Sequence, residues 1–293
     1  MSRKFKSLCA LICTAVLMLS MCFSASAVFL EGAELTNVQE ETFIPVNVYL
    51  NGKYMSDAMM LGGTSYVDAA EFVESILGQS CSRSWSAEES ALRILYGDVS
   101  LYLNLADHYI LINERCIPLG GRVFNIDGSI FVPIRPLARA LGAQLRVFGH
   151  GENMVIDLRR ENGASIISGS EYYNAEDLYW LSRVIFAESG NQPIEGMIGV
   201  GNVVLNRVRD DSGLFPDSVQ GVIFQSGQFS VVDAGSIYSE PSARSVIAAK
   251  LCLEGCSTVG DCLFFLNPSI SDSTWFDTNR VFRLSIGEHY FYA

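Results

Sequence analysis

The chain has 293 residues, of which 49% are hydrophobic and 18% are charged, and its formal net charge is −12. The acidic excess argues against nucleic acid or an anionic lipid surface as a partner, because both are negatively charged. It does not argue against an uncharged glycan, and the length allows two domains of modest size.

The first 27 residues have the pattern of a secretory signal peptide. Three basic residues start the chain, an apolar run extends from Leu8 to about Phe23, and Ala25-Ser26-Ala27 fits a cleavage site. A retained membrane anchor is the alternative, but the apolar run is short for a membrane span. We expect a secreted protein with a signal peptide over residues 1–27. Its formal charge is −15 once the three basic residues are removed. We expect no membrane contact after cleavage.

Residues 28–44 are polar and acidic and predict a linker, and residues 45–158 predict a small α+β domain. Alternating and β-branched residues separated by turn formers indicate strands. We expect these strands at residues 46–50, 65–67, 91–97, 99–105, 109–114 and 129–134. Helices are predicted over residues 68–78 and 135–142, each ended by a glycine.

Two stretches of this domain repeat one pattern. SYVDAAEFVESILG and SIFVPIRPLARALG both run from a strand through a turn and a helix to Leu-Gly. The order of elements, with FVPIRPLARALGAQL in the second copy, resembles the copper amine oxidase N-terminal-like domain. The resemblance implies a wall-associated or spacer module, and a purely structural domain without a ligand is the alternative. His108 and His150 are far apart and have no ligand cluster around them, so we expect no metal here.

Five cysteines follow the signal peptide: Cys81, Cys116, Cys252, Cys256 and Cys262. An odd number leaves at least one unpaired or intermolecular. Cys256 and Cys262 flank the short loop STVGD and could form a disulfide, and Cys252 could equally pair with Cys262. Buried free thiols are the third possibility. No CxxC pair or histidine cluster indicates a zinc site.

A second linker is predicted over residues 159–173, and residues 174–293 change to longer helices. NAEDLYWLSRVIFAES predicts a helix with Asn174 as its N-cap and two acidic residues in its first turn. Gly190 and Asn191 end it, and Pro193 starts the next helix, IEGMIGVGNVVLNRVR. Gly196, Gly199 and Gly201 predict close packing of that second helix against another element.

Glu188 lies in the last turn of the first helix, where the negative helix end disfavours a charged carboxylate. Neighbouring apolar side chains, including Val184 and Ile185, would further disfavour the charged form by desolvation. Both effects raise the pKa, and a carboxylic acid protonated near neutral pH suits general-acid cleavage of a glycosidic bond. An exposed glutamate without a role is the alternative.

Four motifs follow one another over about 120 residues: LSRVIFAESGNQPIEGMIGVGNVVLNRV, FPDSVQGVIFQSGQFSVV, GDCLFFLNPSISDSTW and IGEHYFYA. In sequence and in order they resemble the SleB-type cell-wall hydrolase family, the spore cortex-lytic enzymes. The resemblance implies a mainly helical, lysozyme-like catalytic domain that cuts peptidoglycan glycan strands without a cofactor. It places the catalytic glutamate at Glu188. Family members often carry a second glutamate four positions on, where this chain has Gln192, so the first position carries the assignment.

A single glutamate fits one route on muramic acid. Glu188 protonates the glycosidic oxygen and then acts as a base while the sugar's own 6-hydroxyl attacks the anomeric carbon. The family resemblance points to this lytic transglycosylase chemistry, with spore cortex as substrate and the cell wall or spore envelope as location. A paired-carboxylate hydrolase needs a second acid, and Glu195, Asp233, Glu240 and Asp261 are candidates without a telling spacing.

Five further residues are candidates for substrate binding: Gln228, Phe229, Asn267, Trp275 and His289. Gln228 and Phe229 could offer an amide and a ring to a sugar. Asn267 could bind a glycan hydroxyl or make an Asx turn. Trp275 could stack on a sugar or fill the core, and His289 could touch substrate or be structural. Asn206 and Arg207 could instead tie helices together.

Several other functions are alternatives to the lytic transglycosylase. A wall protein with a catalytically silent domain would bind glycan only, and Gln192 is compatible with that reading. A water-using muramidase or glucosaminidase would need a second carboxylate. A zinc amidase needs a ligand set that three scattered histidines do not readily supply. A cysteine peptidase needs a Cys-His pair, and Cys256 lacks a setting that lowers its pKa.

Overall fold

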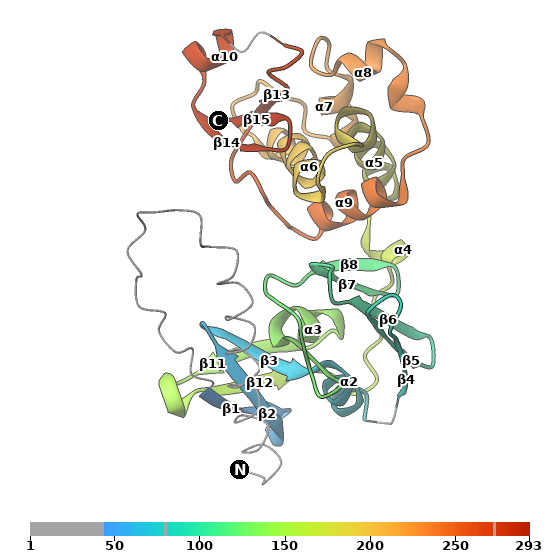
Figure 1. The fold of residues 1–293 in the computed structure, drawn as a ribbon, viewed down its shortest axis with the longest axis vertical. Coiled ribbons are helices and arrows are strands. Elements are labelled where there is room, and N and C mark those ends of the chain that lie inside the picture. The colour runs from blue at the N-terminus through green and yellow to red at the C-terminus, as the bar shows by residue number, and fades with distance from the viewer. Residues whose placement is uncertain (1–43, 79–80, 272–273) are drawn as a thin grey trace, which may run out of the picture. The chain divides into compact units, whose positions relative to one another are not determined.

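The computed structural model describes residues 44–78, 81–271 and 274–293. The predicted signal peptide, and residues 28–43 of the predicted linker, lie outside the described residues. The chain forms two compact units (Figure 1). The first runs to Ile110 and continues over Leu119–Ile166, and the second contains Leu111–Pro118 and Ile167–Ala293. No helix in the described ranges is both long enough and apolar enough to cross a membrane.

Two sheets build most of the first unit. The larger sheet has the strand order β11-β12-β1-β2-β3-β10-β9. Its strands are β1 (Ile44–Leu50), β2 (Lys53–Leu61), β3 (Thr64–Asp68), β9 (Phe124–Ile126), β10 (Ser129–Pro133), β11 (Gln144–Phe148) and β12 (Val155–Arg159). The second sheet has the order β4-β5-β6-β7-β8. Its strands are β4 (Ser82–Ser86), β5 (Ala91–Tyr96), β6 (Val99–Asn104), β7 (Tyr109–Ile112) and β8 (Arg115–Pro118). The end of β7 and all of β8 belong to the second unit.

The two repeated stretches form matching strand–helix units. β3 leads into α2 (Ala69–Leu77), and β10 leads into α3 (Ile134–Ala140). The two strands pair antiparallel in the larger sheet, with Val132 opposite Val67. The Asp68 side chain accepts from the Glu71 N–H and caps α2, which ends at Gly78 with φ 74°. A 3-10 turn, η1 (Gly151–Asn153), precedes β12.

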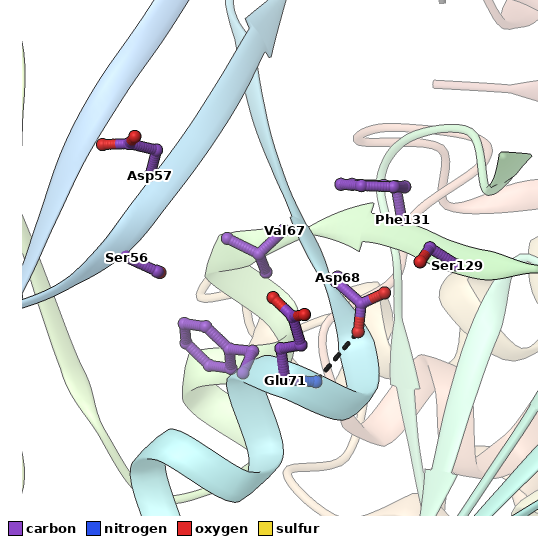
Figure 2. Close-up of a pocket in the computed structure, with 8 residues that line it drawn as sticks. Ser56, Asp57, Val67, Asp68, Glu71, Ser129 and Phe131 are labelled. Atoms are coloured by element: carbon purple, nitrogen blue, oxygen red, sulfur yellow. Dashed lines mark hydrogen bonds between the residues drawn. The ribbon is translucent and has the colours of Figure 1, made fainter. Parts of the chain in front are cut away.

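A small cavity of about 110 Å³ opens between β2, β3, α2 and β10. It is lined by Ser56, Asp57, Val67, Asp68, Glu71, Phe72, Ser129 and Phe131. Figure 2 shows the Asp68 carboxylate bound to the Glu71 N–H, at 2.8 Å, so this carboxylate serves the helix cap. The cavity lies wholly within the first unit.

Helices dominate the second unit, in which α5, α6 and α9 pack against one another (Figure 1). The helices are α4 (Gly169–Tyr172), α5 (Ala175–Ser189), α6 (Ile194–Arg209), α7 (Val219–Phe224), α8 (Ser230–Asp233), η2 (Ser236–Tyr238), α9 (Ala243–Leu253) and α10 (Thr274–Asn279). A three-stranded sheet of order β13-β15-β14 completes the unit. Its strands are β13 (Phe264–Leu266), β14 (Phe282–Ile286) and β15 (His289–Tyr292). The α+β prediction, with a sheet-rich first part and a mainly helical second part, is confirmed.

Glycines let α6 approach its neighbours closely. A Cβ at Gly201 would lie 2.7 Å from Cys252 Sγ on α9 and 2.9 Å from Ile185 Cδ1 on α5. A Cβ at Gly199 would lie 2.7 Å from Phe291 Cζ on β15. These separations are shorter than carbon contacts allow, so the predicted close packing is confirmed at both positions.

The loop after α9 is held to α6 by hydrogen bonds. The Asn202 amide donates to the Cys256 carbonyl at 2.7 Å and accepts from the Thr258 N–H at 2.9 Å. Asn206 donates to the carbonyls of Gly260 and Cys262, and Arg207 Nε donates to the Leu263 carbonyl at 2.7 Å. Asn206 and Arg207 therefore tie α6 to this loop. Neither disulfide considered for the loop is present, since Cys252, Cys256 and Cys262 are free thiols.

Candidate active site

Helix α5, which carries Glu188, has the N-cap and the buried face that the sequence predicts. Asn174 caps α5 by accepting from the N–H groups of Glu176 and Asp177. Leu181, Val184 and Ile185 are fully buried and precede Glu188 by seven, four and three residues. Residues at these spacings share one helix face, so the Glu188 side chain starts from the apolar face of α5.

Partial burial makes the Glu188 carboxyl a weaker acid than an ordinary glutamate. Desolvation raises the pKa of Glu188 from its ordinary value of 4.5 to about 7. No hydrogen bond or ion pair to the Glu188 carboxyl is recorded among the residues that the structure describes. Such partners would stabilise the charged form and lower the pKa. The carboxyl therefore keeps its proton to a higher pH than an ordinary glutamate, and this proton is available for transfer to a bound group.

The four carboxylates considered as a second acid have other surroundings. Glu240 is exposed and binds Arg183 at 2.8 Å, and Asp261 is exposed and lies 3.4 Å from Arg283. Glu195 and Asp233 are exposed. None of the four contributes to the pKa shift of Glu188.

The turn after Glu188 contacts the turn between β14 and β15. Gln192 is 4% exposed. Its Nε2 donates to Glu288 Oε2 at 3.1 Å and to Asn191 Oδ1 at 3.0 Å, and its Oε1 accepts from the Glu288 N–H at 2.9 Å. Asn267 Nδ2 donates to the same Glu288 oxygen at 3.3 Å. The structure thus brings Asn267 to the turn that follows Glu188.

The predicted substrate-binding residues occupy different environments. Gln228 is exposed before α8, whereas Phe229 is 4% exposed, and its ring lies 6.2 Å from the Phe265 ring. Phe229 therefore belongs to the core in this structure. Trp275, on α10, is 55% exposed and its ring lies 5.2 Å from Phe276, so it does not fill the core.

His289 and Asn267 each have a structural contact. His289 is 5% exposed, and its ring lies edge-on to Phe265 at 5.4 Å. Desolvation lowers the His289 pKa, an effect that the neighbouring Glu288 charge opposes. Asn267 Oδ1 accepts from the Ser269 N–H at 2.9 Å, which is the predicted Asx turn.

Sequence reasoning missed Glu288, and it named Gln192 only as a departure from the family pattern. Glu288 stands inside the quoted motif IGEHYFYA, beside the histidine that drew attention. An exposed glutamate in a hairpin turn carries no local signal, because its partners Gln192 and Asn267 lie 96 and 21 residues away.

Other chemistries fit the described residues poorly. No group of three or more His, Cys, Asp or Glu side chains within residues 44–78, 81–271 and 274–293 could hold a metal ion. The residues present therefore do not fit the copper that the name of the N-terminal domain suggests. Burial and the charge of Glu195 raise the pKa of the Cys256 thiol, which opposes formation of a nucleophilic thiolate.

Two protein families match separate parts of the chain. The cell wall hydrolase family matches residues 191–292, a stretch that begins just after Glu188. The copper amine oxidase N-terminal domain family matches residues 49–156. Both families were expected from sequence motifs, and both are confirmed.

Curated relatives are spore cortex-lytic enzymes. That of Oceanobacillus iheyensis is 30% identical over 51% of this chain and 57% of its own length. That of Bacillus subtilis strain 168 is 32% identical over 41% of this chain and 38% of its own length. The chain thus spans about half, or less, of the length of the curated relatives it matches.

A solved structure, the catalytic domain of the germination-specific lytic transglycosylase SleB from Bacillus anthracis, is 33% identical. It covers 41% of this chain and 97% of its own, with a TM-score of 0.38. Residues 191–292 are therefore a cell wall hydrolase domain and residues 49–156 a copper amine oxidase N-terminal domain, in a chain homologous to spore cortex-lytic enzymes.

Proposed function

We propose that this protein is a secreted lytic transglycosylase that cleaves the glycan strands of spore cortex peptidoglycan, with Glu188 as its general acid and base. The observation that carries the proposal is the Glu188 carboxyl. This carboxyl lies in the last turn of α5 on the apolar face of the helix, and burial raises its pKa to about 7. Within the described residues it makes no hydrogen bond or ion pair.

The proposed reaction needs one carboxyl group and no cofactor. Glu188 gives its proton to the oxygen that leaves C1 of muramic acid, and the C1–O bond breaks. The 6-hydroxyl of the same sugar then bonds to C1 and returns its proton to the Glu188 carboxylate. The glutamate ends as it began, no water is consumed, and the new end is a 1,6-anhydromuramic residue.

Two observations support this chemistry and this substrate. The candidate second acids Glu240 and Asp261 are occupied by arginines, whereas a hydrolase acts through a pair of carboxyl groups facing one bond. The relatives are named spore cortex-lytic enzymes, which favours cortex glycan as the substrate and the cell wall or spore envelope as the location.

The test compares the protein with its Glu188→Gln variant on purified cortex and on vegetative peptidoglycan. Soluble products are separated and weighed by mass spectrometry. We expect anhydromuramic ends from the wild type, at a rate that the variant lowers by about a hundredfold or more, because the amide cannot donate a proton.

Each other outcome selects a different function. Reducing ends that carry one added water would identify a muramidase or glucosaminidase and would require a second carboxylate. If neither protein releases glycan while both bind the insoluble substrate, the domain is a catalytically silent glycan-binding module. The exposed Glu195→Gln variant is the matched control, because it removes the same charge at the start of the next helix.

A further inference from the structure

Three separate segments of the second unit converge on one side-chain oxygen, Oε2 of Glu288. They are the α5–α6 turn through Gln192, the loop after β13 through Asn267, and the β14–β15 turn, which carries Glu288 itself. We call these three residues the Glu288 latch. The α5–α6 turn begins at Gly190, two residues after Glu188, so the latch contacts the turn that ends the helix carrying the proposed acid.

The chemistry of the latch defines the orientation of the Gln192 amide. The backbone N–H of Glu288 can only donate, so the Gln192 oxygen must face it, at 2.9 Å. The Gln192 nitrogen then faces Glu288 Oε2, which accepts at 3.1 Å. An amide at position 192 and a carboxylate at position 288 are therefore complementary, and a carboxylate at both positions is not.

The α5–α6 turn and the β14–β15 turn pack closely against each other. Gly287 has φ 57°, and a Cβ there would lie 2.3 Å from Gln192 Oε1 and 3.0 Å from Pro193 Cδ. A Cβ at Gly196 would make ordinary contacts with Gln192 Cβ at 3.4 Å and Ile286 Cγ2 at 3.6 Å. Gln192 is thus enclosed between the β14–β15 turn and the first turn of α6.

We propose that Gln192, Asn267 and Glu288 are positioning residues for the site of Glu188. The Glu288 carboxylate holds the end of α5 and the loop at Asn267 in one arrangement through two amide donors. This inference rests on the proposed function of Glu188. In this proposal Glu288 does not touch the substrate. It affects the rate only by helping to hold the Glu188 carboxyl in position.

The test is a charge-exchange series measured as initial rates of product release from cortex. Gln192→Glu sets two carboxylates against each other, and we expect the rate to fall about 10- to 100-fold. Glu288→Gln keeps an acceptor oxygen for both donors and should stay within about threefold of the wild type.

The double variant Gln192→Glu with Glu288→Gln decides the question. It restores an amide facing a carboxylate with the roles exchanged, so the rate should recover most of the loss. Full recovery is not expected, because the amide nitrogen introduced at position 288 faces the Asn267 amide without accepting from it. A double variant no faster than Gln192→Glu alone, or a Gln192→Glu rate equal to the wild type, would overturn the proposal.

A second pair of variants keeps the proposal testable if Gln192→Glu fails to fold. Asn267→Asp places a second carboxylate beside Glu288 at a position less buried than Gln192, and the repulsion should lower the rate. Adding Glu288→Gln removes one of the two charges and should restore part of the rate. Glu195→Gln is the charge-matched control and should leave the rate unchanged. Loss of activity in Glu188→Gln with no effect in the latch series refutes the latch alone. A wild type that releases nothing refutes the proposed function.

Discussion

At the scale of single residues, Glu188 shows how burial alone can prepare an acid. Its carboxyl lies in the last turn of a helix, on the face that carries the buried Val184 and Ile185, and desolvation raises its pKa to about 7. The buried environment that makes the proton available also opposes the charged form of the side chain. Activity and stability should therefore respond to pH through this one group.

The rate of glycan cleavage should fall as the pH rises through about 7. The general acid must be protonated, and above its raised pKa the protonated fraction of Glu188 drops about tenfold per pH unit. The measurement is the initial rate of product release from cortex between pH 5 and 9. The Glu195→Gln control should keep the same profile, and a rate that is constant from pH 6 to 9 would contradict the assignment.

Glu188→Gln should stabilise the folded protein at alkaline pH. Between about 4.5 and 7 the folded protein retains a proton that the unfolded chain has lost, so the free energy of unfolding falls as the pH rises. The variant avoids this loss, on the order of 1–3 kcal/mol. Thermal unfolding should show a higher Tm than the wild type at pH 8 and no gain at pH 4. An equal difference in Tm at both pH values would contradict this.

At the scale of secondary-structure elements, the position of α6 depends on two features. Its glycines have no side chains and allow close packing, and its asparagines donate hydrogen bonds to a neighbouring loop. Because Gly199 and Gly201 have no side chains, Phe291, Cys252 and Ile185 can pack directly against the backbone of α6. Asn202 and Asn206, one turn apart, hold the loop after α9 through its carbonyl groups. These contacts stabilise the loop without the disulfide that the cysteine spacing suggested.

Gly201→Ala should destabilise the protein, whereas Gly196→Ala should not. The added methyl at position 201 meets Cys252 Sγ at 2.7 Å, and such overpacking costs about 1–3 kcal/mol, more than the helix propensity that alanine gains. At position 196 the contacts are ordinary, so alanine should be neutral or slightly stabilising. Urea unfolding of both variants measures the difference, and equal midpoints would refute the packing argument.

At the scale of the whole molecule, a buried ion pair joins distant parts of the sequence within the second unit. Arg115 Nε donates to Glu254 Oε1 at 2.8 Å, with their side chains 6% and 0% exposed. The Tyr173 hydroxyl donates to the same oxygen at 3.3 Å and accepts from the Cys116 N–H at 2.9 Å. This network explains why residues 111–118 belong to the second unit.

Arg115→Met should lower the stability of the full-length protein by about 3–5 kcal/mol, because it removes the guanidinium that pairs with the buried Glu254 carboxylate. Arg115→Met combined with Glu254→Leu should recover much of that loss, since two apolar residues can replace a buried pair. Guanidinium chloride unfolding at pH 7 measures both. A double variant no more stable than the single one would show that the charge is not the cause.

Local patterns determined much of this protein. Turn glycines and alternating residues predicted the two strand–helix repeats, and the Asn174 cap and helical spacing predicted α5 and α6 with Glu188 at a helix end. Strand β2, KYMSDAMML, was missed because its methionines and charges lack the alternation of a half-buried strand. Its strand conformation depends on pairing with β1 and β3.

Only the tertiary structure decided where the candidate site residues lie and which of them contact one another. It buried Phe229, exposed Trp275 and brought Glu288 to Gln192, 96 residues apart. The physical reason is the range of the interactions. Caps, turns and helix faces depend on neighbours within a few residues, which a sequence displays directly. Burial, desolvation and hydrogen bonds between distant segments exist only after the chain has packed.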